Sequence, residues 1–144
     1  MSTRRTRLSG IFGAGKLEEL SDRSMAAELT ISETCKQYDV SHRTLRYYED
    51  EGLISPRREN GQRLYDDEVR KRLRLILLGR ELGFSLFEIK EIVNNADVGE
   101  SIAFEQLLSN QQILAQIEYL EQKRKASDSA IARLRAHLSR RQDI

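Results

Sequence analysis

The stretch from Val40 to Tyr65 limits most strongly what this chain can fold into: V-S-H-R-T-L-R-Y-Y-E-D-E-G-L-I-S-P-R-R-E-N-G-Q-R-L-Y. Ser41 is a favourable N-cap for a short basic helix, because its hydroxyl can accept a hydrogen bond from a free amide of the first turn. Gly52 suits the left-handed residue that ends a helix. Asn60-Gly61 tolerates the positive φ angles of a type I′ turn and predicts a β-hairpin. A basic helix followed by a basic hairpin is typical of a winged helix-turn-helix.

An earlier helix completes the predicted helix-turn-helix. It spans residues 30–37, with Ile31 and Cys35 on one face because they are four residues apart, and a turn follows at residues 38–39. Cys35 has two interpretations, a redox or metal-binding thiol or a small buried apolar residue. The second is favoured, since neither another cysteine nor a histidine at ligand spacing accompanies it. A single cysteine also excludes an intrachain disulfide and fits a cytoplasmic protein.

Two further helices are expected after the hairpin. The first is capped by Asp66 or Asp67 and extends to about residue 82, with apolar residues on both faces. Both faces are therefore expected to be buried, one against the helix-turn-helix and the other against a partner element. Ser85 and Glu88 have the spacing of a capping box for the second helix, which reaches about residue 93 and precedes a polar linker over residues 94–100. The apolar positions of these helices are Val69, Leu73, Ile76 and Leu77, then Leu75, Leu78 and Leu82, then Leu86, Ile89 and Val93.

Residues 102–140 contain no proline or glycine and predict one long helix. Its apolar stripe alternates steps of four and three residues, as in a coiled coil, and passes through Arg124 and Ser127. A lone helix cannot bury such a stripe, so an antiparallel or parallel second copy is needed and a homodimer is predicted. The alternative is a helix that folds back onto its own domain. Arg124 and Ser127 suit a core poorly, and are expected where the stripe frays or where the other subunit covers them. The predicted dimerisation residues are Ile113, Ile117, Leu120, Arg124, Ser127, Ile131, Leu134 and Leu138.

Composition and local motifs exclude several function classes. A net charge of +1 gives no global basic field, so nucleic-acid binding has to rest on locally placed arginines. No stretch approaches the roughly 18 to 20 apolar residues that would span a membrane. Residues 10–16 match most of a phosphate-binding loop, but Leu17 stands where Ser or Thr would bind magnesium. No nucleophile-base pair or metal cluster is present, so no enzymatic activity, metal or cofactor is expected. Residues 1–28 are predicted to be a flexible extension, with a short helix at most over residues 16–20.

Three sequence blocks resemble the MerR family of bacterial transcription regulators. They are R-T-L-R-Y-Y-E-D-E-G-L, N-G-Q-R-L-Y and L-G-F-S-L-F-E-I-K, in the order and near the spacing of the family, and the resemblance covers residues 29–93. S-P-R-R-E-N-G-Q-R-L-Y and L-I-L-L-G-R-E-L-G-F-S-L are most similar to a branch that controls branched-chain amino-acid and fatty-acid breakdown. Family members usually begin a few residues before the first helix, which would place the native start at Met25.

The resemblance implies a set of DNA contacts on the second helix and the wing. Arg43 and Arg46 lie three apart and share a helix face, and a guanidinium can bind phosphate or the edge of guanine. Tyr48 is implied to donate its hydroxyl to a phosphate while Tyr47 packs inward, because adjacent helical side chains point about 100° apart. The predicted DNA-binding residues are Ser41, His42, Arg43, Thr44, Arg46, Tyr48, Arg57, Arg58, Asn60, Gly61, Gln62, Arg63 and Arg80.

The wing and the helix after it carry further arginines. Arg63 matches the wing arginine that holds phosphate, together with one of Arg57 or Arg58. Two positions depart from the family pattern: Gln62 stands where Tyr is usual, and Leu64 replaces a polar residue. These departures leave the phosphate contacts intact and affect the detail and sequence preference of the wing. Two interpretations stay open for four more cations, as added backbone contacts or as the polar positions of an amphipathic helix: Arg70, Lys71, Arg72 and Arg74.

The predicted architecture is mainly α. A winged helix-turn-helix DNA-binding domain with a small β-hairpin wing spans residues 29–96, a linker and an antiparallel coiled-coil dimerisation helix span 97–140, and a tail spans 141–144. The resemblance implies a homodimer on palindromic double-stranded DNA, which bends and untwists a promoter so that RNA polymerase can engage widely spaced elements. A small-molecule effector is not identified, and its expected pocket is bounded by the helix after Ser85, the linker and the start of the long helix. The branch resemblance suggests an acyl-CoA. The alternatives are an architectural or adaptor protein with little sequence discrimination, and an enzyme.

Overall fold

The computed structural model describes residues 27–96 and 103–143. It consists of two compact units, the first ending at Leu107 and the second beginning at Leu108. Several expectations lie outside the described residues: the flexible extension and short helix before residue 27, the start at Met25, and the part of the linker at 97–102.

The first two described helices form the helix-turn-helix. They are α3 (Ile31–Tyr38) and α4 (His42–Asp50), joined by a turn in which Asp39 adopts a left-handed φ of 55°. Thr30 caps α3 reciprocally with Glu33, since each side chain accepts a hydrogen bond from the other residue's backbone N–H. The buried residues of α3 are Thr34 and Tyr38. Ile31 and Cys35 are both only partly buried, so the expectation that Cys35 is a buried apolar residue is met only in part.

A small antiparallel sheet contains the two strands of the wing and a third, short strand that lies directly before α3. Its strands are β1 (Leu29–Thr30), β2 (Arg57–Glu59) and β3 (Gln62–Tyr65), in the order β1-β3-β2. Asn60 and Gly61 form the tip with φ angles of 51° and 78°, which confirms the turn that their sequence predicts. The third strand was not predicted: Leu29 pairs with Tyr65 and Thr30 with Leu64. This pairing fixes one side of the hairpin to the residues that lead into α3.

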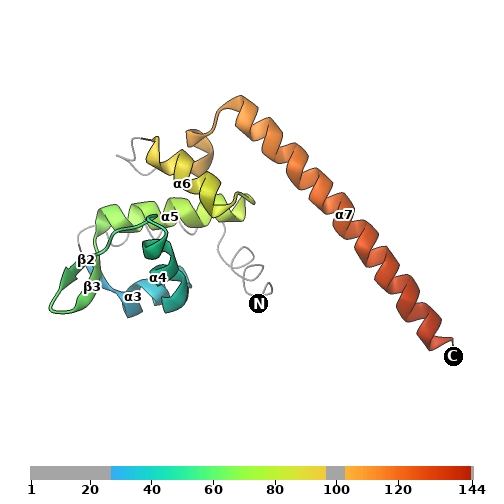
Figure 1. The fold of residues 1–144 in the computed structure, drawn as a ribbon, viewed down its shortest axis with the longest axis horizontal. Coiled ribbons are helices and arrows are strands. Elements are labelled where there is room, and N and C mark those ends of the chain that lie inside the picture. Colours follow the sequence, from blue (N-terminus) through green and yellow to red (C-terminus); the bar gives the residue numbers. More distant parts are fainter. Residues whose placement is uncertain (1–26, 97–102, 144) are drawn as a thin grey trace. The chain divides into compact units, whose positions relative to one another are not determined.

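Helix α5 (Asp67–Glu81) is the centre of the first unit and lies between α6 (Leu86–Asn94) and the α3–α4 pair (Figure 1). Asp66 caps α5, and Ser85 with Glu88 forms the expected capping box of α6. Both faces of α5 are buried, as its apolar pattern predicts. At Gly79 an added Cβ would lie 2.9 Å from Cγ1 of Ile89 and 3.0 Å from the Phe104 ring, so this glycine allows α6 and the following segment to pack closely.

The long helix begins later than expected. Phe104 starts a short 3-10 helix, η1 (Phe104–Leu107), is fully buried, and packs its ring against Phe84 with centroids 5.5 Å apart. Only then does α7 (Asn110–Gln142) begin, capped by Ser109 with Gln112. The expected start near residue 102 is wrong, because Phe104 packs into the first unit and the capping box defines a new helix start. No residue of α7 is buried.

Candidate nucleic-acid interface

The N-terminal turn of α4 is fixed by its cap. Ser41 accepts a hydrogen bond from the Thr44 amide at 3.0 Å, and the two hydroxyl oxygens lie 2.9 Å apart. Capping of this kind stabilises the first turn and leaves the remaining free amides at the positive end of the helix. The predicted contact residues Ser41 and Thr44 are thus placed at the helix start, where their first role is to hold α4 in shape.

His42 joins α4 to α3. Its Nε2 lies 3.2 Å from the Ser32 hydroxyl, and its Nδ1 lies 3.6 Å from the sulfur of Cys35. The expectation that Cys35 has no histidine neighbour is therefore wrong: residues seven apart in sequence meet because the turn folds the two helices together. Burial raises the pKa of the Cys35 thiol, which Arg46 opposes without offsetting it. A thiol with a raised pKa is a poor nucleophile, so this pair is a packing contact between the two helices.

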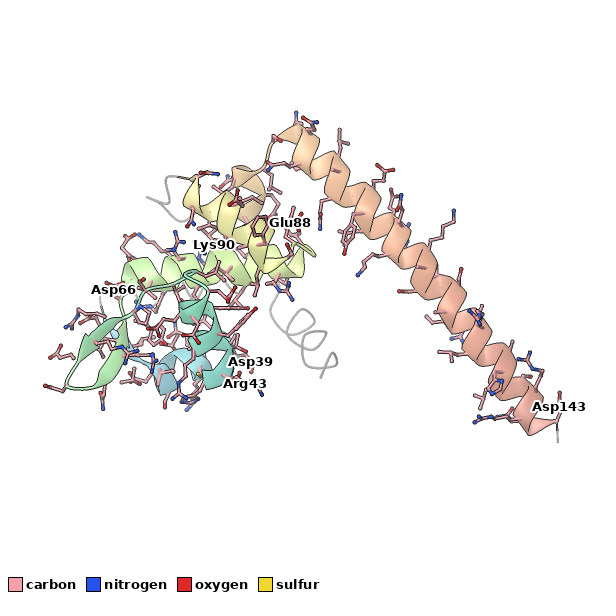
Figure 2. The ribbon with its side chains drawn as sticks, in the orientation of Figure 1. Asp39, Arg43, Asp66, Glu88, Lys90 and Asp143 are labelled. Atoms are coloured by element: carbon pink, nitrogen blue, oxygen red, sulfur yellow. The ribbon has the colours of Figure 1, made fainter. Side chains whose placement is uncertain are left out.

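The outward face of α4 carries its cations. Arg43 and Arg46 are both exposed, and within the described residues neither makes an ion pair. Figure 2 shows Arg43 at the outer end of α4, near Asp39 of the turn and on the far side of the unit from Glu88 and Lys90 of α6. Two unpaired guanidinium groups three residues apart, beside a helix N-terminus, form a surface suited to polyanions.

The two tyrosines of α4 are placed opposite to the expectation. Tyr48 is only 5% exposed and packs inward with Leu45, whereas Tyr47 is 49% exposed. The expected inward packing of Tyr47 is therefore wrong. The spacing contains the signal that identifies the inward residue, because Leu45 and Tyr48 lie three apart and share a face, as Arg43 and Tyr47 do at four apart. The phosphate contact predicted for Tyr48 stays a prediction, and Tyr47 is an additional candidate on the same face as Arg43.

Two wing arginines are held by one carboxylate of α4. Arg63 Nε donates to Glu49 Oε1 at 2.6 Å, and Arg58 Nη2 approaches Glu49 Oε2 at 3.4 Å. Burial raises the pKa of Glu49, but the hydrogen bonds and charges of Arg63 and Arg58 outweigh it, so that this pKa lies below its ordinary value. Arg63 and Glu49 are about one-fifth exposed, whereas Arg58 is 56% exposed. Glu49 therefore fixes the wing to α4, and sequence reasoning missed this contact.

The remaining predicted wing cation forms a separate cluster. Arg57 donates to both oxygens of Glu28, at 3.0 and 2.7 Å, and lies 2.8 Å from Glu59. These hydrogen bonds raise the pKa of Arg57. The three tip residues beside it, Asn60, Gly61 and Gln62, are exposed. Arg57 thus reaches a phosphate only by giving up a paired carboxylate, whereas Arg58 is held by one long contact.

The arginines of α5 separate into different roles. Arg70 and Arg74 are 3% and 1% exposed, and Arg70 donates to the carbonyls of Ala27 and Tyr65. Neither expected interpretation fits these two residues, because both lie on buried faces of α5. Arg72 donates to the Leu53 carbonyl at 2.9 Å. Arg80 is partly buried and donates to the Phe84 carbonyl at 3.1 Å, which places it at the end of α5 as a helix-turn contact.

Metal sites and membrane-spanning helices are absent from the described residues. Across residues 27–96 and 103–143, no group of three or more His, Cys, Asp or Glu side chains is arranged to hold a metal ion. Among the helices in these two ranges, none combines the length and the apolar character needed to cross a membrane. The expected effector pocket includes residues 97–102, which lie outside the described residues.

Comparison with known proteins places the chain in a family. Residues 29–96 match the family model described as MerR HTH family regulatory protein, and residues 70–139 match the model described as MerR, DNA binding. The HTH-type transcriptional regulator CueR of Salmonella typhi is 37% identical over 68 residues, covering 46% of this chain and 49% of that protein. Heavy metal-dependent transcription regulator 2 of Rhizobium meliloti is 43% identical over 67 residues, covering 45% of this chain and 46% of that protein. The chain thus spans about half the length of the curated relatives it matches.

Two solved structures share the fold over a larger part of the chain. The MtaN N-terminus of the Bacillus subtilis multidrug transporter activator is 29% identical with a TM-score of 0.56, covering 76% of this chain and 97% of that one. A MerR family transcriptional regulator from Bacillus cereus is 30% identical with a TM-score of 0.63, covering 78% of each chain. With two family models along residues 29–139 and a solved relative matched over most of its length, this chain belongs to the MerR family of helix-turn-helix regulatory proteins.

Proposed function

We propose that this protein is a sequence-specific DNA-binding transcriptional regulator that acts as a homodimer on palindromic promoter sites. The observation that carries the proposal is the outward face of α4, where Arg43 and Arg46 are exposed and unpaired within the described residues beside a capped helix N-terminus. The relatives named above are regulators, which supports a regulatory role over an enzymatic one. Action in the cytoplasm, on promoter DNA engaged by RNA polymerase, follows from the same proposal.

The geometry supports a division of labour among the predicted contacts. The N-terminal half of α4 enters the major groove, where Arg43 or Arg46 binds the O6 and N7 edge of guanine or a phosphate. The hairpin tip, with Asn60, Gly61 and Gln62, lies on the flanking backbone with Arg58 as its most available cation. Arg63 and Arg57 reach phosphates only in competition with their carboxylates. Two copies then bend and untwist the site, at a cost in DNA deformation energy that depends on its sequence.

The exposed stripe of α7 supports the homodimer. Leu134 is 70% exposed, Leu138 54%, Ile117 48%, Ile131 44% and Leu120 40%. An apolar stripe of this extent on a helix with no buried residue is the pattern that a coiled-coil partner covers. Dimerisation also matches a palindrome, because each half-site then receives one α4. The domain arrangement that we propose is a DNA-binding unit followed by this dimerisation helix.

Selection of genomic DNA tests the proposal. Purified protein is incubated with sheared DNA from its own source, and bound fragments are sequenced. We expect an inverted repeat between promoter elements that are spaced too far apart. Fragments without a shared motif, with a steep salt dependence of affinity, would overturn the regulator and favour the architectural alternative.

Matched variants locate the interface. Arg43→Ala and Arg46→Ala are each expected to weaken binding to the selected repeat by about 1–3 kcal/mol, with sequence preference relaxed at the contacted base. Arg140→Ala on α7 removes the same charge far along the chain from α4 and is expected to leave affinity unchanged. Equal losses for all three variants would show that affinity follows total charge instead of the α4 face.

A small-molecule effector is a separate proposal with its own readout. The branch resemblance favours an acyl-CoA thioester, and ligand binding to the folded protein raises its unfolding temperature. A thermal-shift series with acyl-CoA thioesters is expected to show a concentration-dependent rise. Coenzyme A without the acyl group is the control, and no shift at saturating thioester would remove this proposal without affecting DNA binding.

A further inference from the structure

The stripe of predicted dimerisation residues on α7, called the seam below, is symmetric about its midpoint when its polar members are counted together with its apolar ones. Arg124 and Ser127 are the two polar members of the stripe, and they occupy its midpoint: three apolar members precede them and three follow. The helix runs without interruption from Asn110 to Gln142 through this point (Figure 1). Arg124 and Ser127 are therefore centrally placed on a continuous helix, and do not mark the end of the stripe.

We propose that Arg124 and Ser127 fix the register of an antiparallel pair formed with a second copy of α7. This inference rests on the homodimer of the proposed function and deepens it by naming the register and its determinants. In the register centred on the midpoint, every apolar seam residue faces an apolar residue and the polar residues face each other. The pairs are Ile113 with Leu138, Ile117 with Leu134, Leu120 with Ile131, and Arg124 with Ser127 of the second copy.

Other arrangements of the same stripe are mismatched. A parallel, in-register pair places the Arg124 guanidinium against its copy, and two like charges at one level of a seam repel. An antiparallel pair shifted by one heptad places Arg124 opposite Leu120 in one direction or Leu134 in the other. The guanidinium then faces a leucine and receives no hydrogen-bond acceptor from the second copy at its own level, which is costly for a charge in the seam. One polar pair at the centre thus disfavours each of the three alternatives.

Two acidic residues border the seam close to Arg124. Glu121 and Asp128 directly follow seam positions 120 and 127, so they border the seam on the side that both helices share. Asp128 is also four residues from Arg124, the spacing of neighbours on one helix face. In the centred register the carboxylates of both copies and the two guanidinium groups lie in the same central stretch of the pair, so the positive charges there have acidic neighbours. The Ser127 hydroxyl of the second copy supplies the acceptor across the seam.

Disulfide trapping measures the register directly. In a Cys35→Ser background, Leu120→Cys protein is mixed with Ile131→Cys protein under mild oxidation. The centred register brings these two positions opposite each other, within the roughly 4.4–6.8 Å between Cα atoms that a disulfide needs. Two copies of position 120 are then about 16 Å apart along the axis. We expect the mixed pair to cross-link at least about tenfold more than either variant alone, and efficient cross-linking of Leu120→Cys with itself would overturn the proposal.

Distances between spin labels outside the seam provide a second measurement of the register. Spin labels at Ala115→Cys, on the face opposite the stripe, are expected to lie about 30 Å or more apart in the dimer, since the antiparallel register separates them by 21 residues along the axis. Ala115→Cys mixed with Ala136→Cys gives a much shorter distance. A short distance for Ala115→Cys with itself indicates a parallel pair and contradicts the proposal.

A further variant tests whether Arg124 determines the register. Arg124→Leu removes the guanidinium while lengthening the apolar stripe, so the dimer is expected to persist but to lose its exclusive register. Cross-linking between positions 120 and 131 falls, and cross-linking in shifted pairs appears. If Arg124→Leu still cross-links only between positions 120 and 131, Arg124 does not set the register.

Sedimentation and DNA binding, measured on the same samples, separate this inference from the proposed function. A monomer that still binds the selected repeat would refute the dimer, whereas a dimer with another register would refute this inference alone.

Discussion

The first unit buries its apolar side chains, whereas α7 leaves its apolar side chains exposed. In the first unit Leu45, Tyr65 and Leu73 are fully buried, and even the guanidinium of Arg74 is 1% exposed. In α7 no residue is buried, and Leu134 is 70% exposed. Burial of apolar area is the main force that stabilises folded chains, so the first unit contains its own stabilisation, whereas in the proposed homodimer α7 gains its stabilisation from a second copy. Under the proposed function, we therefore expect the fold of the DNA-binding unit to be independent of protein concentration, and the spacing of two such units to depend on association.

The largest expected effect concerns the core of the first unit. Phe104→Ala removes a fully buried ring that packs against Phe84 and beside Gly79, and is expected to lower the free energy of unfolding by about 3–5 kcal/mol. Denaturant unfolding followed by tyrosine fluorescence reports this unit, because all tyrosines except Tyr119 lie in it. Phe87→Ala is the control, since Phe87 is 73% exposed and its loss is expected to change little. Equal effects would show that η1 does not belong to this core.

The second effect distinguishes α7 by its dependence on concentration. Leu120→Ser on the exposed stripe is expected to weaken the dimer by about 2 kcal/mol per chain, because an apolar contact with the second copy is lost. The unfolding temperature of α7 then falls on dilution, as mass action requires, while the transition of the first unit stays in place. Gln122→Ser, two residues away and off the stripe, serves as the control. A loss that is independent of concentration would indicate that α7 packs on its own chain.

The sequence predicts the elements that depend on local chemistry. Caps at Ser41, Asp66 and Ser85 and the turn at Asn60-Gly61 are confirmed, because a cap or a primed turn is decided by neighbouring residues. The order of elements and the long final helix follow from these signals together with hydrophobic period. Local signals also explain the late start of α7, where the Ser109 and Gln112 capping box was available and was missed.

What the sequence leaves open is decided by contacts between distant residues. The two tyrosines of α4 are an exception, because Tyr48 shares a helix face with the buried Leu45 and this local signal was available and was missed. Glu49 is recognised as a link to the wing only when the hairpin folds back onto α4, since Arg63 lies 14 residues later. The same holds for Arg70, whose charge predicts exposure although its position on α5 is buried against the residues before α3 and the end of β3.

A smaller effect is expected for the link between α4 and the wing. Glu49→Gln removes a carboxylate that accepts from Arg63, and is expected to lower the free energy of unfolding by about 1 kcal/mol at neutral pH. The pKa of Glu49 is lower in the folded protein than in the unfolded chain, so its contribution is present above the unfolded value and is lost as pH falls through the folded value. The difference between wild type and Glu49→Gln should therefore shrink on acidification below about pH 4.5.

A double variant tests whether the stabilisation lost in Glu49→Gln comes from the interaction between Glu49 and Arg63. If Arg63 and Glu49 act together, Arg63→Gln and Glu49→Gln combined cost less than the sum of the single changes. An additive result, or a difference between wild type and Glu49→Gln that is independent of pH, would mean that Glu49 stabilises the unit by some other contact. Binding of the selected repeat, measured on the same variants, shows whether a loosened wing also weakens the complex.

The smallest effect is expected at Arg57, where two observations point in different directions. Its pKa is raised by the hydrogen bonds that it donates to the carboxylates of Glu28 and Glu59, which suggests a strong pair, but its side chain is 49% exposed and that of Glu28 is 36% exposed. The exposure of the two side chains determines how much the pair stabilises the fold, because water and salt screen the charges and the ordering of two long side chains offsets their attraction. Arg57→Ala is therefore expected to leave the free energy of unfolding unchanged within error, in contrast to the shielded Arg63 on the same hairpin. A clear loss of stability that persists in high salt would show that the cluster at Glu28 fixes the wing as firmly as Glu49 does.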